Sequence, residues 1–86
     1  MNYRQLHYAV LLAKEGNFSQ VAESLGITQP ALSKQILSLE KEIGVALFDR
    51  SRIPIVPTAA GEYFVREAEE LLFREDRLLR SMEQFK

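Results

Sequence analysis

Residues 28–42 constrain this chain most, because they combine a helix start, one apolar stripe and the end of a long run without acidic side chains. Thr28 is a favoured N-cap residue, and Pro30 falls in the first turn, where a missing backbone N–H costs nothing. Four apolar residues follow at steps of four, three and four, which on a helix form one stripe that faces a core: Leu32, Ile36, Leu39 and Ile43. The pattern predicts a helix over about residues 28–42 with one buried side.

The opposite face of this helix carries Pro30, Lys34, Leu37, Ser38 and Lys41, with Gln29 and Ser33 at its flanks. No acidic residue occurs from residue 24 to residue 39. A surface that offers an amide, hydroxyls and a lysine behind a positive helix end suits the major groove of DNA. The same pattern also fits an ordinary amphipathic helix with a solvated face, so the flanking segments must decide.

Two shorter helices are predicted before this stretch. Residues 2–14 form the first, with Gly16 as its stop, and Arg4 at its start either contacts a phosphate or is solvated. Asn17 and Gln20 fit a capping box for the second, which runs to Gly26. Two helices joined by a short glycine-containing turn predict a helix-turn-helix, in which the second helix reads DNA and the first crosses the backbone.

A proline-flanked segment over about residues 49–57 follows, and it predicts a small β-wing. Pro54 and Pro57 exclude a helix and limit any sheet to an edge. Arg50 and Arg52 have no acidic neighbour after Asp49 until residue 62. Arginine on a thin loop suits contact with phosphates or the minor groove, and the alternative is a surface loop with two solvated arginines.

Thr58 is expected to cap a last helix that runs to about residue 84. Apolar residues alternate three and four apart along it, interrupted by Glu75. Such a helix extends about 40 Å at 1.5 Å per residue, which is more than this small core can cover. Its stripe therefore predicts pairing with a second copy rather than a cofactor site, through Phe64, Ala68, Leu71, Leu72, Leu78, Leu79 and Met82.

The composition and the motifs exclude several classes of function. The 86 residues contain no cysteine, which excludes disulfides, thiolate metal sites and cysteine catalysis. The sequence contains no nucleophile–base pair, no set of metal ligands and no glycine loop that could bind a phosphate. We therefore expect neither enzymatic activity nor a bound cofactor. With no targeting signal and no membrane span, a cytoplasmic location is expected.

The net charge of −1 argues against strong DNA binding by a single copy, because affinity for DNA comes mostly from basic side chains that neutralise phosphates. Residues 1–58 hold six basic and five acidic side chains, whereas residues 59–86 hold five basic and seven acidic ones. Residues 1–58 can thus bind DNA through their local geometry, and we expect a monomer to bind weakly.

Several runs together resemble a known family: FSQVAESL at residues 18–25, ITQPALSKQI at 27–36, LE at 39–40, GVALFDR at 44–50 and TAAG at 58–61. Along essentially its whole length the chain resembles the N-terminal DNA-binding region of LysR-type transcriptional regulators of bacteria. The resemblance implies a mostly α fold: a winged helix-turn-helix of three helices and a short β-wing over residues 1–58, then a linker and dimerisation helix over residues 59–86.

The resemblance also implies roles for individual residues. Gln29, Ser33 and Lys34 would face base edges, with Pro30 beside them. Thr28 and Ser38 would contact phosphates, and the wing would contribute Arg50, Arg52 and Pro54. Linker helices pair antiparallel in this family, and the sites on double-stranded DNA are imperfect inverted repeats. Full-length members carry a C-terminal domain that binds a small-molecule co-inducer, and they usually form tetramers. Because the sequence stops at Lys86, we expect an excised DNA-binding region without that domain.

Three positions depart from the family pattern. Lys34 stands where arginine is common, which weakens bidentate recognition of guanine. Leu37 stands where a basic or polar residue is common, so this position either lacks a phosphate contact or meets a thymine methyl. Pro57 stands where leucine is frequent, which puts the pairing of the wing strands in question.

A second interpretation is a winged helix that serves as a protein-interaction or dimerisation module. The low net charge and the long apolar stripe favour it. The acid-free run before residue 40 disfavours it, because an interaction surface without a DNA constraint usually mixes charges of both signs.

Overall fold

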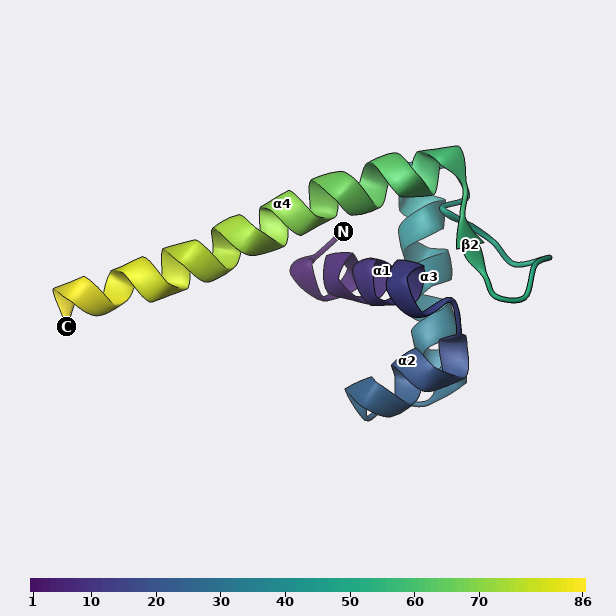
Figure 1. The fold of residues 1–86 in the computed structure, drawn as a ribbon, viewed down its shortest axis with the longest axis horizontal. Coiled ribbons are helices and arrows are strands. Elements are labelled where there is room, and N and C mark those ends of the chain that lie inside the picture. The colour runs from purple at the N-terminus through teal and green to yellow at the C-terminus, as the bar shows by residue number, and fades with distance from the viewer.

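The structure is a computed structural model that describes all 86 residues. It contains four α-helices, two short strands and a closing 3-10 turn: α1 Tyr3–Glu15, α2 Phe18–Leu25, α3 Gln29–Ile43, β1 Phe48–Asp49, β2 Val56–Pro57, α4 Ala59–Ser81 and η1 Met82–Phe85. Helices α1 to α3 gather at one end of the molecule, the wing projects from that end, and α4 runs away in the opposite direction (Figure 1). The predicted winged helix followed by a long helix is therefore confirmed.

Each α-helix begins after a residue whose side chain accepts a hydrogen bond from a backbone N–H that has no carbonyl partner within the helix. Asn2, Asn17, Thr28 and Thr58 each accept a hydrogen bond from the backbone N–H three residues on. The predicted caps at Asn17, Thr28 and Thr58 are thus present. The capping box at the start of α2 is only half formed, because Gln20 donates its backbone N–H to Asn17 but makes no bond back with its side chain.

The turn between α2 and α3 requires a glycine. Gly26 has a φ of 71°, in the left-handed region that other residues rarely adopt. Its N–H donates to the carbonyl of Glu23 at 3.1 Å, and the N–H of Ile27 donates to the carbonyl of Ala22 at 3.0 Å. These bonds close the end of α2 and turn the chain into α3.

The main core lies between α1, α2, α3 and β1. Its eleven buried residues are Tyr8, Ala9, Leu12, Phe18, Val21, Ala22, Leu32, Ile36, Leu39, Leu47 and Phe48. The predicted stripe of α3 is buried except for Ile43, which is exposed because the last turn of α3 extends past this core. Val45 and Ala46 are exposed as well, so only Leu47 and Phe48 anchor the segment after α3.

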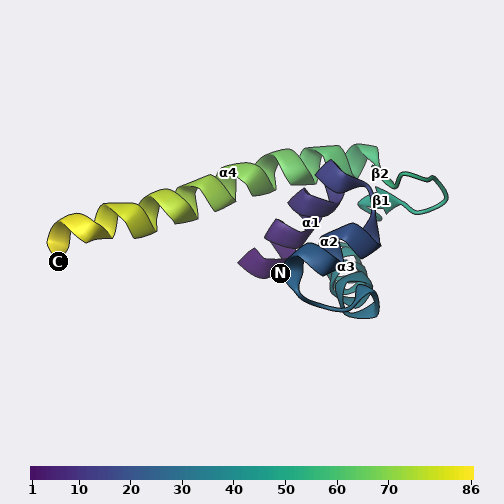
Figure 2. The ribbon, with the colours of Figure 1, turned by 60° about the horizontal axis from the view of Figure 1, so that its bottom comes forward.

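Helix α1 is buried on more sides than one apolar stripe would predict, because it lies between the α2–α3 pair and α4 (Figure 2). Leu6 and Val10 pack against Val65 and Ala68 of α4 in a second, smaller cluster. Beyond that region α4 leaves the core and continues alone, so that the molecule measures 48 × 27 × 20 Å.

The end of α4 differs from the prediction. The α-helix stops at Ser81 and tightens into the 3-10 turn η1, whereas the sequence predicted an α-helix to about residue 84. At this end the Ser81 hydroxyl donates to the carbonyl of Leu78 at 2.9 Å, and the N–H of Met82 donates to the carbonyls of Leu78 and Arg80. Last turns of α-helices commonly tighten into a 3-10 turn in this way. None of the helices is both long enough and apolar enough to span a lipid bilayer.

The wing is a two-stranded antiparallel ribbon, with Phe48 opposite Pro57 and Asp49 opposite Val56. Pro57 therefore does not prevent the pairing. The base of the wing is fixed on two sides: the N–H of Thr58 donates to the carbonyl of Leu47 at 3.0 Å, and the N–H of Ile55 donates to the carbonyl of Gly16 at 2.9 Å. The wing is thus tied to the end of α1.

Candidate nucleic-acid interface

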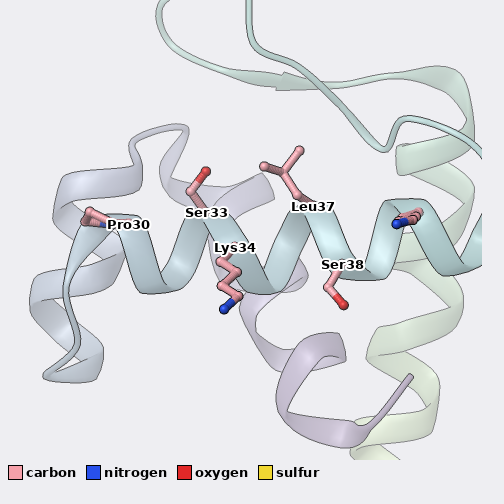
Figure 3. Close-up of a pocket in the computed structure, with 6 residues that line it drawn as sticks. Pro30, Ser33, Lys34, Leu37 and Ser38 are labelled. Carbon is pink, nitrogen blue, oxygen red and sulfur yellow. The ribbon is translucent and has the colours of Figure 1, made fainter.

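The outer face of α3 forms an open groove lined by Pro30, Ser33, Lys34, Leu37, Ser38 and Lys41. Figure 3 looks onto this face: Ser33 and Leu37 point to one side of the helix, and Lys34 and Ser38 point to the other. The lining contains polar and basic side chains and no acidic one. The structure therefore gathers the residues of α3 that the sequence predicted for its outer face.

The basic side chains of this face have no acidic partner within the chain. Neither Lys34 nor Lys41 takes part in a salt bridge, and the same holds for Arg4 at the start of α1. The acidic Glu42, near the end of α3, is paired with the N-terminal ammonium of Met1. The two lysines of this face are therefore free to pair with an anion outside the chain.

The first turn of α3 presents Gln29 in a defined orientation. The hydroxyl of Ser19, on α2, donates a hydrogen bond to Oε1 of Gln29 at 2.9 Å. The amide NH2 group of Gln29 is left to donate outward. Thr28 uses its Oγ1 to accept from the N–H of Ala31 at 3.2 Å, so its hydroxyl hydrogen stays available to an outside acceptor.

Arg50 lies between three elements rather than in the open wing. Its Nη1 donates to Oγ of Ser33 at 3.0 Å, and its Nη2 lies 3.5 Å from Oε1 of Glu40. The guanidinium carbon sits 4.7 Å from the centre of the Phe18 ring, within the range of a cation–π contact. Only 33% of the Arg50 side chain is exposed.

Sequence reasoning did not anticipate the role of Glu40. Its carboxylate, 11% exposed, accepts the N–H groups of Leu47 at 2.6 Å and of Phe48 at 3.2 Å. It thereby ties α3 to the first residues of the wing. A signal was present, because Glu40 is the first acidic residue after a long acid-free run and directly follows the buried Leu39. An acidic side chain in that position needs a partner.

The rest of the wing is exposed. Arg52 faces solvent and lies 3.7 Å from the carboxylate of Asp49. Hydrogen bonds from the side chain and the backbone of Ser51, together with the charge of Arg52, hold the pKa of Asp49 below its ordinary value. Ile53 is 99% exposed, and Pro54 lies beside Gly16 at the end of α1. The wing is therefore held at its base and open at its tip.

The residues predicted for dimerisation fall into two groups. Phe64, Ala68 and Leu72 pack against α1 within the chain, and Ala68 is 1% exposed. The other four are exposed along the free part of α4: Leu71, Leu78, Leu79 and Met82. Helix α1 covers Ala68 completely, whereas Phe64 and Leu72 are only partly buried.

The structure contains no group of three or more His, Cys, Asp or Glu side chains placed so that they could hold a metal ion. The features that stand out are the groove on α3, the wing beside it and the free stripe of α4. The family model described as "Bacterial regulatory helix-turn-helix protein, lysR family" matches residues 3–62. The chain belongs to the LysR family of bacterial helix-turn-helix regulators.

Relatives in this family are named transcriptional regulators. The regulator ClcR of Pseudomonas putida is 43% identical over 72 residues, which cover 84% of this chain and 24% of ClcR. The regulator BenM of Acinetobacter baylyi is 38% identical over 79 residues, which cover 92% of this chain and 26% of BenM. The chain thus spans about a quarter of the length of these relatives.

Solved structures of LysR regulators share the fold. The DNA-binding domain of BenM in complex with catB site 1 DNA superposes with a TM-score of 0.96 at 35% identity, over 99% of this chain and 91% of that one. Full-length CbnR in complex with its target DNA gives a TM-score of 0.88 at 35% identity, over 96% of this chain and 29% of that one. Both are complexes with DNA.

Proposed function

We propose that this chain is the DNA-binding module of a bacterial LysR-type transcription regulator and acts in the cytoplasm without enzymatic activity. Its α3 enters the major groove of double-stranded DNA, and its wing lies on the backbone or in the minor groove. The observation that carries the proposal is the groove on α3, where lysines without ion pairs stand among hydroxyls on an acid-free face. The likeness to the DNA-bound BenM domain supports it.

The groups on this face divide into those that would contact bases and those that would contact phosphates. Gln29, Ser33 and Lys34 offer donors to base edges, with Pro30 beside them at the leading end of the groove. Thr28, Ser38 and Arg4 contact phosphates, which fix the position of the protein but carry no sequence information. Arg52 and Pro54 belong to the wing contact.

We further propose a division of labour along the chain. Residues 1–58 form the DNA-binding domain, and residues 59–86 pair with a second copy through the exposed apolar residues of α4. Pairing makes the second DNA contact intramolecular, which offsets the weak affinity expected of one copy with a net charge of −1. The DNA site is then an inverted repeat, with α3 of each copy in successive major grooves.

The relatives are about three and a half times as long as this chain. In a full-length protein we propose that a C-terminal effector domain binds a small-molecule co-inducer and supports a tetramer. The DNA-binding module itself needs no cofactor for this function.

A salt titration separates DNA recognition from the second candidate, a protein-interaction module that the exposed α4 stripe favours. The logarithm of the DNA affinity of the wild-type chain falls linearly with the logarithm of salt concentration, with a slope of about −0.9 for each phosphate neutralised. Lys34→Ala lowers the affinity, whereas Lys86→Ala at the far end of the chain leaves it unchanged. A flat titration, or equal reductions in both variants, supports the interaction module instead.

A further inference from the structure

The contact between Arg50 and Ser33 sets the direction of a hydrogen bond. A guanidinium group has only donors, so Oγ of Ser33 must be the acceptor in the 3.0 Å bond from Nη1. One lone pair of the hydroxyl is then occupied. The hydroxyl hydrogen cannot point at Nη1, because the N–H of Arg50 occupies that side of the oxygen, and this leaves it free to donate toward the groove.

Much of the Arg50 guanidinium is engaged within the chain. One face of its guanidinium lies over Phe18, and one edge is shared between Ser33 and Glu40. The carboxylate of Glu40 offsets its charge. Glu40 in turn is held by two backbone N–H groups, so the arrangement is fixed from the α3 side as well as from the wing.

We propose that Arg50 is a positioning residue that fixes Ser33 as a hydrogen-bond donor, so that this point of α3 selects a DNA base edge carrying an acceptor. This rests on the proposed DNA-binding function. The acceptors of the major groove are N7 and O6 of guanine, N7 of adenine and O4 of thymine. The amino groups of cytosine and adenine are disfavoured there, because Oγ of Ser33 already accepts one hydrogen bond from Arg50 and keeps only its second lone pair for another donor. Sequence reasoning placed Arg50 among the direct DNA contacts, and the structure points to an indirect role.

The test measures base discrimination and salt dependence separately. The wild-type chain is first used to select its preferred duplex from a random pool. Affinities for that duplex, and for duplexes changed one base pair at a time, are then measured for five proteins: wild type, Arg50→Lys, Ser33→Ala, the double variant and Arg52→Ala. Lysine keeps the charge of Arg50 and any phosphate contact, but it cannot span Ser33, Glu40 and Phe18 together. Circular dichroism confirms that each variant is folded.

If Arg50 acts through Ser33, the variants give a specific pattern of base discrimination. Arg50→Lys and Ser33→Ala each reduce discrimination at the same base pair by roughly fivefold or more, and the double variant is no less selective than either single variant. The salt slope of Arg50→Lys is unchanged. Arg52→Ala, the control in the same wing, weakens binding to all duplexes alike and makes the salt slope shallower by about 0.9 for each phosphate that Arg52 neutralises.

Other outcomes overturn the proposal. If Arg50→Lys keeps full discrimination, or lowers all affinities equally, Arg50 does not act through Ser33. If the effects of the single variants add in the double variant, the two residues act independently. In these cases the proposed DNA-binding function stands, since the wild type still selects a sequence. If the wild type selects no sequence at all, the proposed function and this inference both fail.

Discussion

The carboxylate of Glu40, on α3, accepts the backbone N–H of Leu47 at 2.6 Å. The same carboxylate accepts from Phe48 and faces Arg50, so one side chain joins the DNA-facing helix to the base of the wing. The distance between the two elements is therefore set by a hydrogen-bonded charge rather than by apolar packing alone. On the proposed function, that distance decides whether α3 and the wing reach their grooves together.

Replacing Glu40 should destabilise the fold in a graded way. Glu40→Ala removes the acceptor of two partly buried N–H groups and the carboxylate that faces Arg50, which should cost about 2–4 kcal/mol of unfolding free energy. Glu40→Gln keeps an acceptor and should cost less. Glu42→Ala is the matched control, because it removes only an exposed ion pair worth about 1 kcal/mol or less. Urea unfolding measures all three, and equal destabilisation by Glu40→Ala and Glu42→Ala would contradict the assignment.

Gly61 is the point at which α4 touches the base of the wing. A Cβ at this position would lie 1.8 Å from the carbonyl oxygen of Leu47. Gly61→Ala should therefore cost about 3 kcal/mol or more of stability, because backbone rather than a flexible side chain must move. Thermal unfolding of Gly61→Ala beside Ala59→Ser, an exposed change in the same turn, checks this. A melting temperature equal to that of Ala59→Ser would show that the packing around Gly61 is not tight.

The exposed stripe of α4 predicts self-association. Leu79 is 65% exposed, so Leu79→Glu should leave the folded monomer intact while shifting the monomer–dimer equilibrium toward monomer. Phe73 is a matched control, since it is 61% exposed but lies about 120° around the helix from Leu79. Sedimentation equilibrium measures both variants. Weaker association in Phe73→Glu than in Leu79→Glu would move the dimer interface to the other face of α4.

Gln29 and Arg52 should affect DNA binding differently. Gln29→Ala removes the amide donor that we propose faces a base edge, so it should relax sequence choice at one base pair. Arg52→Ala removes an exposed wing charge, so it should weaken binding to all sequences and lower the salt slope by about one. Affinities for single-base variants of the preferred duplex, measured at several salt concentrations, separate the two effects. An unchanged sequence preference in Gln29→Ala would remove Gln29 from the set of base-reading residues.

Local rules were sufficient for most of the fold. The N-caps at Asn17, Thr28 and Thr58, the turn at Gly26 and the buried stripe of α3 depend on residues within a few positions of each other, and all are present in the structure. The outer face of α3 followed from helical spacing, because a helix that buries one side must expose the other.

The same rules could not predict interactions between segments that are far apart in the sequence. Arg50 and Ser33 are 17 positions apart, and no periodicity relates them, so Arg50 was expected to be a free wing arginine. Ala68 was expected in the dimer stripe because its spacing fits, yet α1 covers it within the chain. Spacing along a helix shows which residues share a face but not which neighbour covers that face.

Two copies of this chain, on our proposal, read DNA together through α3. Selection of the purified domain against a random pool of duplex DNA, at low and then moderate salt, tests this directly. We expect an inverted repeat whose half-sites lie one helical turn, or a multiple of it, apart on one side of the duplex. Surviving duplexes that share no sequence would contradict the proposal.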